Sequence, residues 1–160
     1  MTSDTDVFRL IDILRDRGMT LSFAESCTGG MAGETITSVS GISDIFLGSA
    51  VTYSNESKES ILGVSHDTLM AYGAVSEECA KEMASGSRRA YCSDIAVSVT
   101  GIAGPGGATY DKPVGLVFVA ATDGTSFVTS ANRFFGDRQE IRKASVNAMF
   151  RDALSLLEGN

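Results

Sequence analysis

The chain alternates stretches of helical and strand-like hydrophobic patterning. Over residues 4–17 the apolar side chains fall on one helical face, and Gly18 is placed to end that helix in a left-handed conformation. Residues 19–24 then alternate as a short strand does, and they lead through ESCTGG (25–30) into a second helical stretch that Gly41 can stop. The pattern therefore places ESCTGG at a strand-to-helix turn.

The middle of the chain continues this alternation. Residues 44–54 predict a strand, and residues 55–62 predict a helix that Gly63 ends. Ser76, which precedes two glutamates, is a typical N-cap for a further helix. The stretch 94–101 is apolar and rich in β-branched residues, which indicates a strand buried on both faces in the middle of a sheet.

The last third combines a loop, a hairpin and a helix. Residues 101–115 are rich in glycine and hold both prolines of the chain, so they can form neither a helix nor a central strand. Two strands flank Asp123 and Gly124, a pair that suits a tight hairpin turn, and a helix begins near Asp137. Early alternation followed by a late hairpin predicts an α/β fold: a three-layer α/β/α sandwich with a mixed sheet, in which residues 1–160 form a single domain.

Composition supports one domain and limits its partners. The 160 residues are 43% hydrophobic, which is enough for one compact core. A net charge of -7 argues against the basic surface that a nucleic-acid partner requires. Residues 1–80 hold four basic and twelve acidic residues, whereas residues 81–160 hold nine and eight, so we expect any anion-binding surface to draw on the second half.

Cysteine usage and the N-terminus indicate the compartment. Cys27, Cys79 and Cys92 are odd in number and form no CxxC pair, which is typical of free thiols in a reducing compartment. No basic stretch leads into an apolar core at the N-terminus, and no apolar run approaches the length of a membrane span. We therefore expect a cytoplasmic protein with no membrane partner.

Several standard catalytic centres lack their residues. The single histidine, His66, and the dispersed cysteines give no metal-binding spacing, and they leave little from which to build a Ser-His-Asp triad. There is no GxxxxGK[ST], GxSxG or SxxK, and GPGG departs from the glycine spacing of a dinucleotide site. We expect neither a metal nor a cofactor.

Ser26 is a candidate nucleophile. Because it follows a strand and precedes a helix, its hydroxyl would lie near backbone N–H groups that can bind a developing oxyanion. These donors belong to Cys27, Thr28, Gly29 and Gly30. The alternative is structural: Ser26 or Thr28 caps the following helix, and the two glycines only shape the turn.

Lys58 is a candidate base for this serine. It is the only basic residue between Arg17 and Lys81, and a neutral amine can accept a proton if burial lowers its pKa. Lowering a lysine pKa from about 10.4 to about 7–8 costs about 4 kcal/mol, so the site must be shielded from water and carboxylates. Glu56 and Glu59 must then point away. The alternative is a solvated lysine on a helix surface.

The glycine-rich loop and two arginines are candidates for binding an anion. The loop lies just beyond the carboxyl end of the buried strand 94–101, where open α/β sheets bind ligands, and its N–H groups can cradle a phosphate or carboxylate. Thr100 ends that strand. Arg138 and Arg142, one helical turn apart, could form a cationic fork. A packing loop and surface arginines are the alternative.

Six motifs in a fixed order resemble a known family. They are ESCTGG (25–30), YSNESK (53–58), YGAVSEECAKEMA (72–84), VTGIAGPGG (99–107), KPVG (112–115) and FFGDRQEIR (134–142). Together they cover nearly the whole chain, and they resemble the CinA C-terminal domain family, whose characterised activity is nicotinamide-nucleotide amidase (PncC).

The resemblance implies a reaction and assigns roles to residues. The reaction is hydrolysis of the carboxamide of nicotinamide mononucleotide to nicotinic acid mononucleotide and ammonia, through an acyl-enzyme and without a cofactor. By matching motif, Ser26 resembles the nucleophile, Lys58 the general base, and Tyr53 a hydroxyl that orients or relays protons. The expected substrate-binding residues are Cys27, Thr28, Gly29, Gly30, Thr100, Gly104, Gly106, Gly107 and Arg142.

The resemblance also bears on assembly and on rival functions. The chain begins about twenty residues before ESCTGG, so we expect the stand-alone form rather than proteins with an additional N-terminal domain. Family members imply a homo-oligomer acting on a small nucleotide. Two other functions stay open: a nucleotide-binding or regulatory module without chemistry, and a hydrolase of other small amides or esters.

Overall fold

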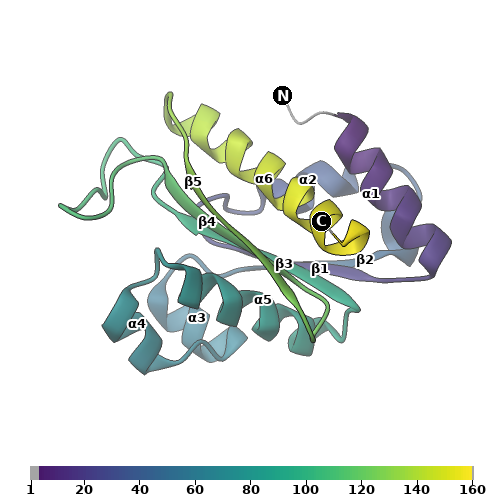
Figure 1. Ribbon diagram of the computed structural model, residues 1–160, viewed down its shortest axis with the longest axis horizontal. Coiled ribbons are helices and arrows are strands. Elements are labelled where there is room, and N and C mark those ends of the chain that lie inside the picture. Colours follow the sequence, from purple (N-terminus) through teal and green to yellow (C-terminus); the bar gives the residue numbers. More distant parts are fainter. Residues whose placement is uncertain (1–3, 160) are drawn as a thin grey trace.

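Helices cover both faces of a five-stranded sheet in the computed structural model, which describes residues 4–159 (Figure 1). In chain order the elements are α1 (Asp4–Arg17), β1 (Leu21–Glu25), α2 (Met31–Thr37), the 3₁₀ turn η1 (Ile42–Asp44), β2 (Phe46–Val51), α3 (Asn55–Leu62), α4 (His66–Tyr72), α5 (Glu77–Tyr91), β3 (Ile95–Gly101), β4 (Leu116–Thr122), β5 (Phe127–Arg133) and α6 (Arg138–Glu158).

The sheet is mixed and forms the middle of three layers. Its strand order is β2-β1-β3-β4-β5; the first three strands run parallel, and β4 and β5 add antiparallel pairings. Figure 1 shows α1, α2 and α6 on one face and α3, α4 and α5 on the other. The predicted α/β/α sandwich is therefore confirmed. No helix within residues 4–159 is long and apolar enough to cross a membrane.

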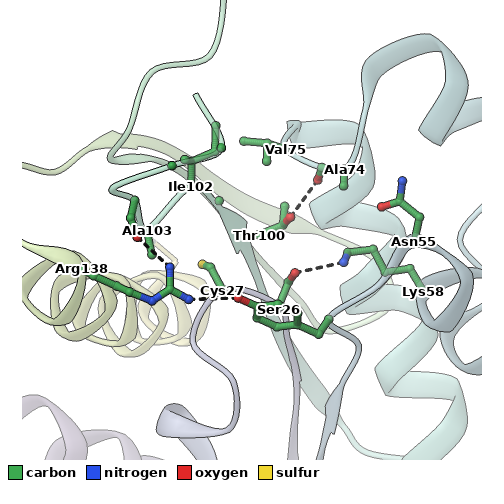
Figure 2. Close-up of a pocket in the computed structure, with 15 residues that line it drawn as sticks. Ser26, Cys27, Asn55, Lys58, Ala74, Val75, Thr100, Ile102, Ala103 and Arg138 are labelled. Carbon is green, nitrogen blue, oxygen red and sulfur yellow. Dashed lines mark hydrogen bonds between the residues drawn. The ribbon is translucent and has the colours of Figure 1, made fainter. Parts of the chain in front are cut away.

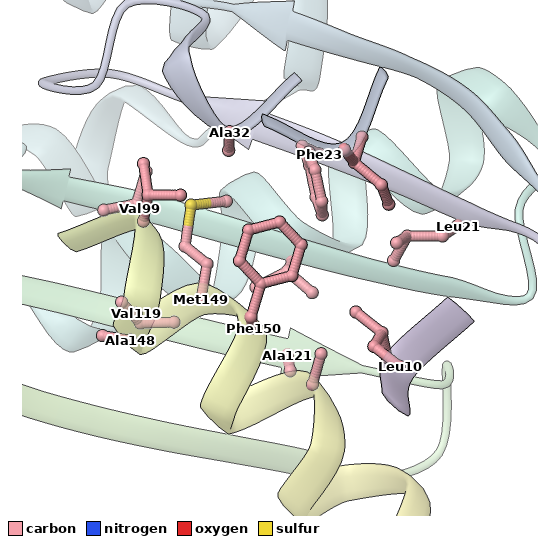
Figure 3. Close-up of a cluster of buried hydrophobic side chains, with 14 of the residues drawn as sticks. Leu10, Leu21, Phe23, Ala32, Val99, Val119, Ala121, Ala148, Met149 and Phe150 are labelled. Atoms are coloured by element: carbon pink, nitrogen blue, oxygen red, sulfur yellow. The ribbon is translucent and has the colours of Figure 1, made fainter. Parts of the chain in front are cut away.

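Large apolar side chains fill the layer between the sheet and α6. Alternate residues of the strands point to this face, among them Phe23 and Val99, and α6 contributes Met149 and Phe150 (Figure 3). The rings of Phe23 and Phe150 meet edge to face with their centroids 5.9 Å apart, a favoured aromatic geometry. This packing fixes α6 across the parallel strands.

Small residues allow close helix packing on the opposite face. A Cβ on Gly86 of α5 would come within 2.0 Å of the Leu62 carbonyl oxygen, so only glycine permits α3 and α5 to approach this closely. Ala80 and Ala84 of α5 pack against β4 in the same way. The close approach of α5 holds α3, and with it Lys58, beside the sheet.

Most predicted elements begin and end where the sequence indicates. Gly18 and Gly63 follow α1 and α3 in the left-handed conformation, and Ser76 caps α5 by accepting the Cys79 N–H. Asp137 caps α6. The predicted central strand is β3, which is buried on both faces, as its apolar sequence predicts.

Four details differ from the prediction. The helix α2 ends at Thr37, so Gly41 does not stop it and instead precedes the 3₁₀ turn η1. β2 is shorter than residues 44–54, because a 3₁₀ turn precedes it and the cap of α3 follows it. The hairpin connection has four residues (123–126) rather than two, because the Asp123 carboxylate accepts backbone N–H groups within it. The pattern does not predict α4, since a seven-residue helix that buries only Leu69 shows little periodicity.

The parallel strands bring three polar residues to one edge of the sheet. Because β1, β2 and β3 run in the same direction, Ser26, Thr52 and Thr100 lie together where these strands end. The chain leaves β1 toward α2 on one face and leaves β2 toward α3 on the other. Such a divergence opens a crevice at the carboxyl ends of the strands, which is where α/β sheets bind ligands.

Candidate active site

A cavity of about 270 Å³ occupies this edge of the sheet (Figure 2). Its walls come from segments that are far apart in sequence: the turn after β1, the start of α3, the connection between α4 and α5, the end of β3 with the glycine-rich loop, and the first turn of α6. Both Ser26 and Lys58 line it. The fold therefore brings these two predicted residues, which are 32 positions apart, into one cavity.

Ser26 and Lys58 are in direct contact. The Lys58 Nζ lies 3.0 Å from the Ser26 Oγ and donates a second hydrogen bond to the Thr52 carbonyl oxygen at 2.8 Å. Ser54 begins α3 by accepting the Ser57 N–H, which places Lys58 in the helical turn that faces the end of β1. Lys58 is 1% exposed and Ser26 is 8% exposed, so the pair is shielded from bulk water.

Burial lowers the pKa of Lys58, and the remaining charge effects on it, from Cys79 and Cys27, are smaller. The two neighbouring glutamates turn outward: Glu56 is exposed, and Glu59 bonds the ring of His66, with 2.8 Å between Oε1 and Nδ1. Without a carboxylate partner to hold its proton, the Lys58 amine is suited to exchange a proton with the serine hydroxyl.

The turn after Ser26 is built on left-handed glycines. Gly29 and Gly30 have φ values of 58° and 103°, which other residues rarely adopt. The Gly29 N–H donates to the Ser26 carbonyl at 3.1 Å, so it is not available to a substrate. The N–H of Thr28 has no acceptor within residues 4–159.

Four predicted binding residues in this turn divide into two groups. Cys27 lines the cavity, and burial raises the pKa of its thiol to about 11, so it is protonated at neutral pH. Thr28, Gly29 and Gly30 do not line the cavity. The Thr28 hydroxyl instead bonds the Glu25 carboxylate at 2.7 Å. The Gly29 N–H and the Thr28 hydroxyl are therefore already bonded inside the protein, whereas the N–H groups of Cys27 and Thr28 stay predicted oxyanion donors.

The end of β3 and the following loop form the opposite wall. Thr100 lines the cavity, and its hydroxyl donates to the Ala74 carbonyl at 2.8 Å, which joins β3 to the α4–α5 connection (Figure 2). Gly104, Gly106 and Gly107, which are predicted to bind substrate, also line the cavity. A Cβ on Gly104 would come within 2.5 Å of Val114, so the backbone path of the loop depends on glycine there.

The two arginines of α6 have different positions. Arg138 lines the cavity, and its guanidinium bonds the Gly104 carbonyl at 2.7 Å and the Tyr53 hydroxyl at 3.0 Å. Arg142 does not line the cavity; it donates to the carbonyl of Cys27 at 3.2 Å and to that of Thr28 at 2.8 Å. Arg142 therefore holds the turn 26–30 from outside the cavity, and Arg138 is the arginine that lines it.

Tyr53 and Asn55 stand at the mouth of the cavity. Tyr53 is 61% exposed, and no hydrogen bond within residues 4–159 joins its hydroxyl to Ser26 or Lys58. Asn55 lines the cavity at the start of α3 but is not among the predicted site residues. The sequence gives no strong signal for it, because asparagine beside an N-cap is common in helices that have no site.

Metal ligands do not gather in this part of the molecule. Among the described residues, no group of three or more His, Cys, Asp or Glu side chains could hold a metal ion. The arrangement that remains is a serine, a buried lysine, backbone donors and one cavity-facing arginine.

The chain is similar in sequence to CinA and competence-damage inducible proteins. A family model described as the CinA C-terminal domain matches residues 6–157. A CinA-like protein of Petrotoga mobilis is 49% identical over 148 residues, and a putative competence-damage inducible protein of Clostridium perfringens is 53% identical over 131 residues. These matches cover 92% and 81% of this chain but only 37% and 32% of the relatives, so the chain spans about a third of their length.

Two solved structures have the same fold over nearly their whole length. The competence/damage inducible protein CihA of Agrobacterium tumefaciens superposes with a TM-score of 0.93 at 37% identity, covering 99% of this chain and 96% of that one. A CinA superfamily protein of Klebsiella pneumoniae also has a TM-score of 0.93, at 31% identity, with 98% of both chains covered.

Proposed function

Because the chain belongs to the CinA C-terminal domain family, we propose that it hydrolyses the carboxamide of nicotinamide mononucleotide to nicotinic acid mononucleotide and ammonia. One observation carries the proposal: the Lys58 Nζ lies 3.0 Å from the Ser26 Oγ inside a cavity. A hydroxyl in contact with a buried amine of lowered pKa is the nucleophile-and-base pair that acyl transfer requires.

The first half of the reaction forms an acyl-enzyme. The Ser26 Oγ attacks the carboxamide carbon while the neutral Lys58 amine takes the hydroxyl proton, so a C–O bond forms and negative charge develops on the carbonyl oxygen. Backbone N–H groups of the turn, those of Cys27 and Thr28, stabilise this oxyanion. The protonated lysine then gives its proton to the amide nitrogen, the C–N bond breaks, and ammonia leaves.

The second half restores the serine. A water molecule attacks the ester carbon, and Lys58 takes one of its protons. When the C–O bond to Ser26 breaks, the lysine returns that proton to the Oγ, and nicotinic acid mononucleotide leaves. Lys58 thus acts as base and then acid in each half, which requires that its pKa stay near the working pH.

The phosphate of the substrate is assigned to the mouth of the cavity. Arg138 is the cavity-lining cation other than Lys58 among the described residues, and it lies beside the glycine-rich loop. A guanidinium next to exposed loop N–H groups suits a phosphate. The carboxamide would then lie toward Ser26 and the phosphate toward Arg138.

The decisive experiment measures ammonia release from nicotinamide mononucleotide. We expect turnover by the wild type and loss of turnover in Ser26→Ala, which removes the attacking oxygen. A wild type that binds the nucleotide but releases no ammonia would instead be a binding or regulatory module. Equal turnover of nicotinamide, which lacks the ribose phosphate, would point to a hydrolase of small amides in general.

A further inference from the structure

Glu25 is a buried carboxylate that the proposed chemistry does not use. It is the last residue of β1, directly before the serine, and it is fully buried. Its carboxylate accepts four hydrogen bonds, two on each oxygen. The donors to Oε1 are the Thr28 hydroxyl at 2.7 Å and the Ala32 N–H at 2.8 Å. The donors to Oε2 are the Ser49 hydroxyl at 2.6 Å and the Gly33 N–H at 3.1 Å.

These hydrogen bonds join the segments on which the site is built. They connect the turn 26–30, which carries Ser26, to the first turn of α2 and to β2. The backbone carbonyl of Glu25 also accepts the Thr52 N–H at 2.8 Å, and the Thr52 carbonyl in turn accepts the Lys58 Nζ. Glu25 is therefore bonded to both the turn that carries Ser26 and the connection that anchors Lys58.

We propose that Glu25 is a positioning residue, which holds Ser26 in hydrogen-bonding geometry with Lys58 by fixing the turn 26–30. The proposal rests on the proposed function, in which Ser26 is the nucleophile. Glu25 does not line the cavity, so it acts through the turn and touches no substrate. A displacement of a reacting group by about 1 Å costs about 100-fold in rate, so an anchor of this kind has a measurable effect.

The donor set requires a carboxylate at this position. Each oxygen faces one hydroxyl, which can rotate, and one backbone N–H, which cannot. In Glu25→Gln, whichever way the amide turns, its NH₂ group opposes either the Ala32 N–H or the Gly33 N–H. One buried backbone donor loses its acceptor, and the turn must move to relieve the contact. Aspartate is shorter by one methylene and cannot reach all four donors.

The test compares Glu25→Gln with a matched control. We expect kcat for ammonia release from nicotinamide mononucleotide to fall about 100-fold. KM and the pH of half-maximal kcat should stay unchanged, because Glu25 does not line the cavity and is not among the groups that shift the pKa of Lys58. The control is Asp152→Asn. Asp152 is also buried, and it is hydrogen-bonded to Ser130 and Arg151. Because these bonds lie within α6 and between α6 and β5, and do not involve the turn 26–30, we expect kcat of Asp152→Asn to stay at the wild-type level.

A second readout separates this proposal from the identity of the substrate. The rate at which a serine-directed fluorophosphonate labels Ser26 depends on the geometry of the serine and not on nicotinamide. If the wild type is labelled but releases no ammonia, the proposed substrate is wrong, and a slower labelling of Glu25→Gln still supports the positioning role. Equal labelling of the two proteins would overturn that role.

A crystal structure gives the remaining control. If the backbone of residues 26–30 in Glu25→Gln superposes on that of the wild type and kcat is unchanged, Glu25 does not position the serine, whatever the substrate is. Should Glu25→Gln fail to fold, Ser49→Ala removes one donor to Oε2 and keeps the carboxylate. For that milder variant we expect kcat to fall about three- to tenfold at constant KM, and an unchanged kcat would contradict the proposal.

Discussion

Arg138 donates a hydrogen bond to the hydroxyl of Tyr53 across 85 positions of sequence, with 3.0 Å between Nη2 and the phenolic oxygen. The same guanidinium bonds the Gly104 carbonyl. The first turn of α6, the connection before α3 and the glycine-rich loop therefore meet at one cation. Both acceptors are neutral. A phosphate can therefore replace them, because its charged oxygens form stronger hydrogen bonds with the guanidinium than a carbonyl or a hydroxyl does.

Replacing Arg138 tests the assignment of the phosphate. We expect Arg138→Ala to raise KM for nicotinamide mononucleotide by about 10- to 100-fold, the value of a charge-assisted hydrogen bond, with a smaller change in kcat. For nicotinamide riboside, which lacks the phosphate, KM should stay the same. Lys143→Ala removes an exposed cation from the same helix and should change neither constant. Equal losses on both substrates would falsify a phosphate contact.

Arg142→Ala should have the opposite kinetic signature. The side chain supports the carbonyls of Cys27 and Thr28, and in a planar trans peptide the Thr28 N–H points away from the carbonyl of Cys27. Losing this support loosens the proposed oxyanion donors. We expect kcat to fall about tenfold or more for phosphorylated and unphosphorylated substrates alike, with KM little changed. A rise in KM confined to the nucleotide would instead make Arg142 a phosphate ligand.

The pH dependence of kcat reports on Lys58. Because the neutral amine is the base and burial lowers its pKa, kcat should fall as the pH drops through that lowered pKa. Lys58→Met should lose at least about 100-fold in kcat at all pH values. A wild-type kcat that stayed constant down to about pH 6 would argue against a neutral amine as the base.

The same shift predicts how stability depends on pH. A lysine whose pKa is lower in the folded state binds fewer protons there than in the unfolded chain, so its contribution to the free energy of unfolding grows as the pH rises toward about 10.4. Lys58→Met lacks this contribution. In urea titrations at a series of pH values, the stability of the wild type relative to Lys58→Met should rise with pH. A constant difference would mean that Lys58 has the same pKa in both states.

Thr52→Val is expected to stabilise the protein. The Thr52 Oγ1 is buried and has no hydrogen-bond partner within the described residues, and an unsatisfied buried hydroxyl is unfavourable. Valine has the same shape, so we expect the free energy of unfolding to rise by about 1 kcal/mol. At residue 52, Lys58 bonds the backbone carbonyl and not the side chain, so kcat should not change. Loss of activity would show that the hydroxyl has a role of its own.

Much of the fold could be predicted because its signals are local. Gly63 ends α3 because a left-handed residue must follow the helix, and Ser76 or Asp137 begins a helix because its side chain accepts a backbone N–H three residues later. The pairing of Ser26 with Lys58 required more than local signals. It depends on β1 and β2 being adjacent and parallel, which the alternating helices and strands predict only in outline.

The different contacts of the two arginines of α6 could not be predicted. Arg138 and Arg142 are one turn apart in a helix, so spacing alone gives both the same face. Their partners differ because the glycine-rich loop lies against the first turn of α6, while the turn 26–30 lies against the second. Likewise, Thr28 is expected to bind substrate, but its hydroxyl already donates a hydrogen bond to the buried Glu25 carboxylate.

The oxygen that anchors Lys58 belongs to the main chain at residue 52. Any amino acid that keeps the backbone N–H and fits this buried position supplies the same acceptor, so substitutions of similar size there would leave the contact with Lys58 intact. Inserting or deleting a single residue between β2 and α3, by contrast, would move the acceptor away from the amine without altering any named catalytic group. For this contact, the length of a short connection matters more than the identity of any side chain in it.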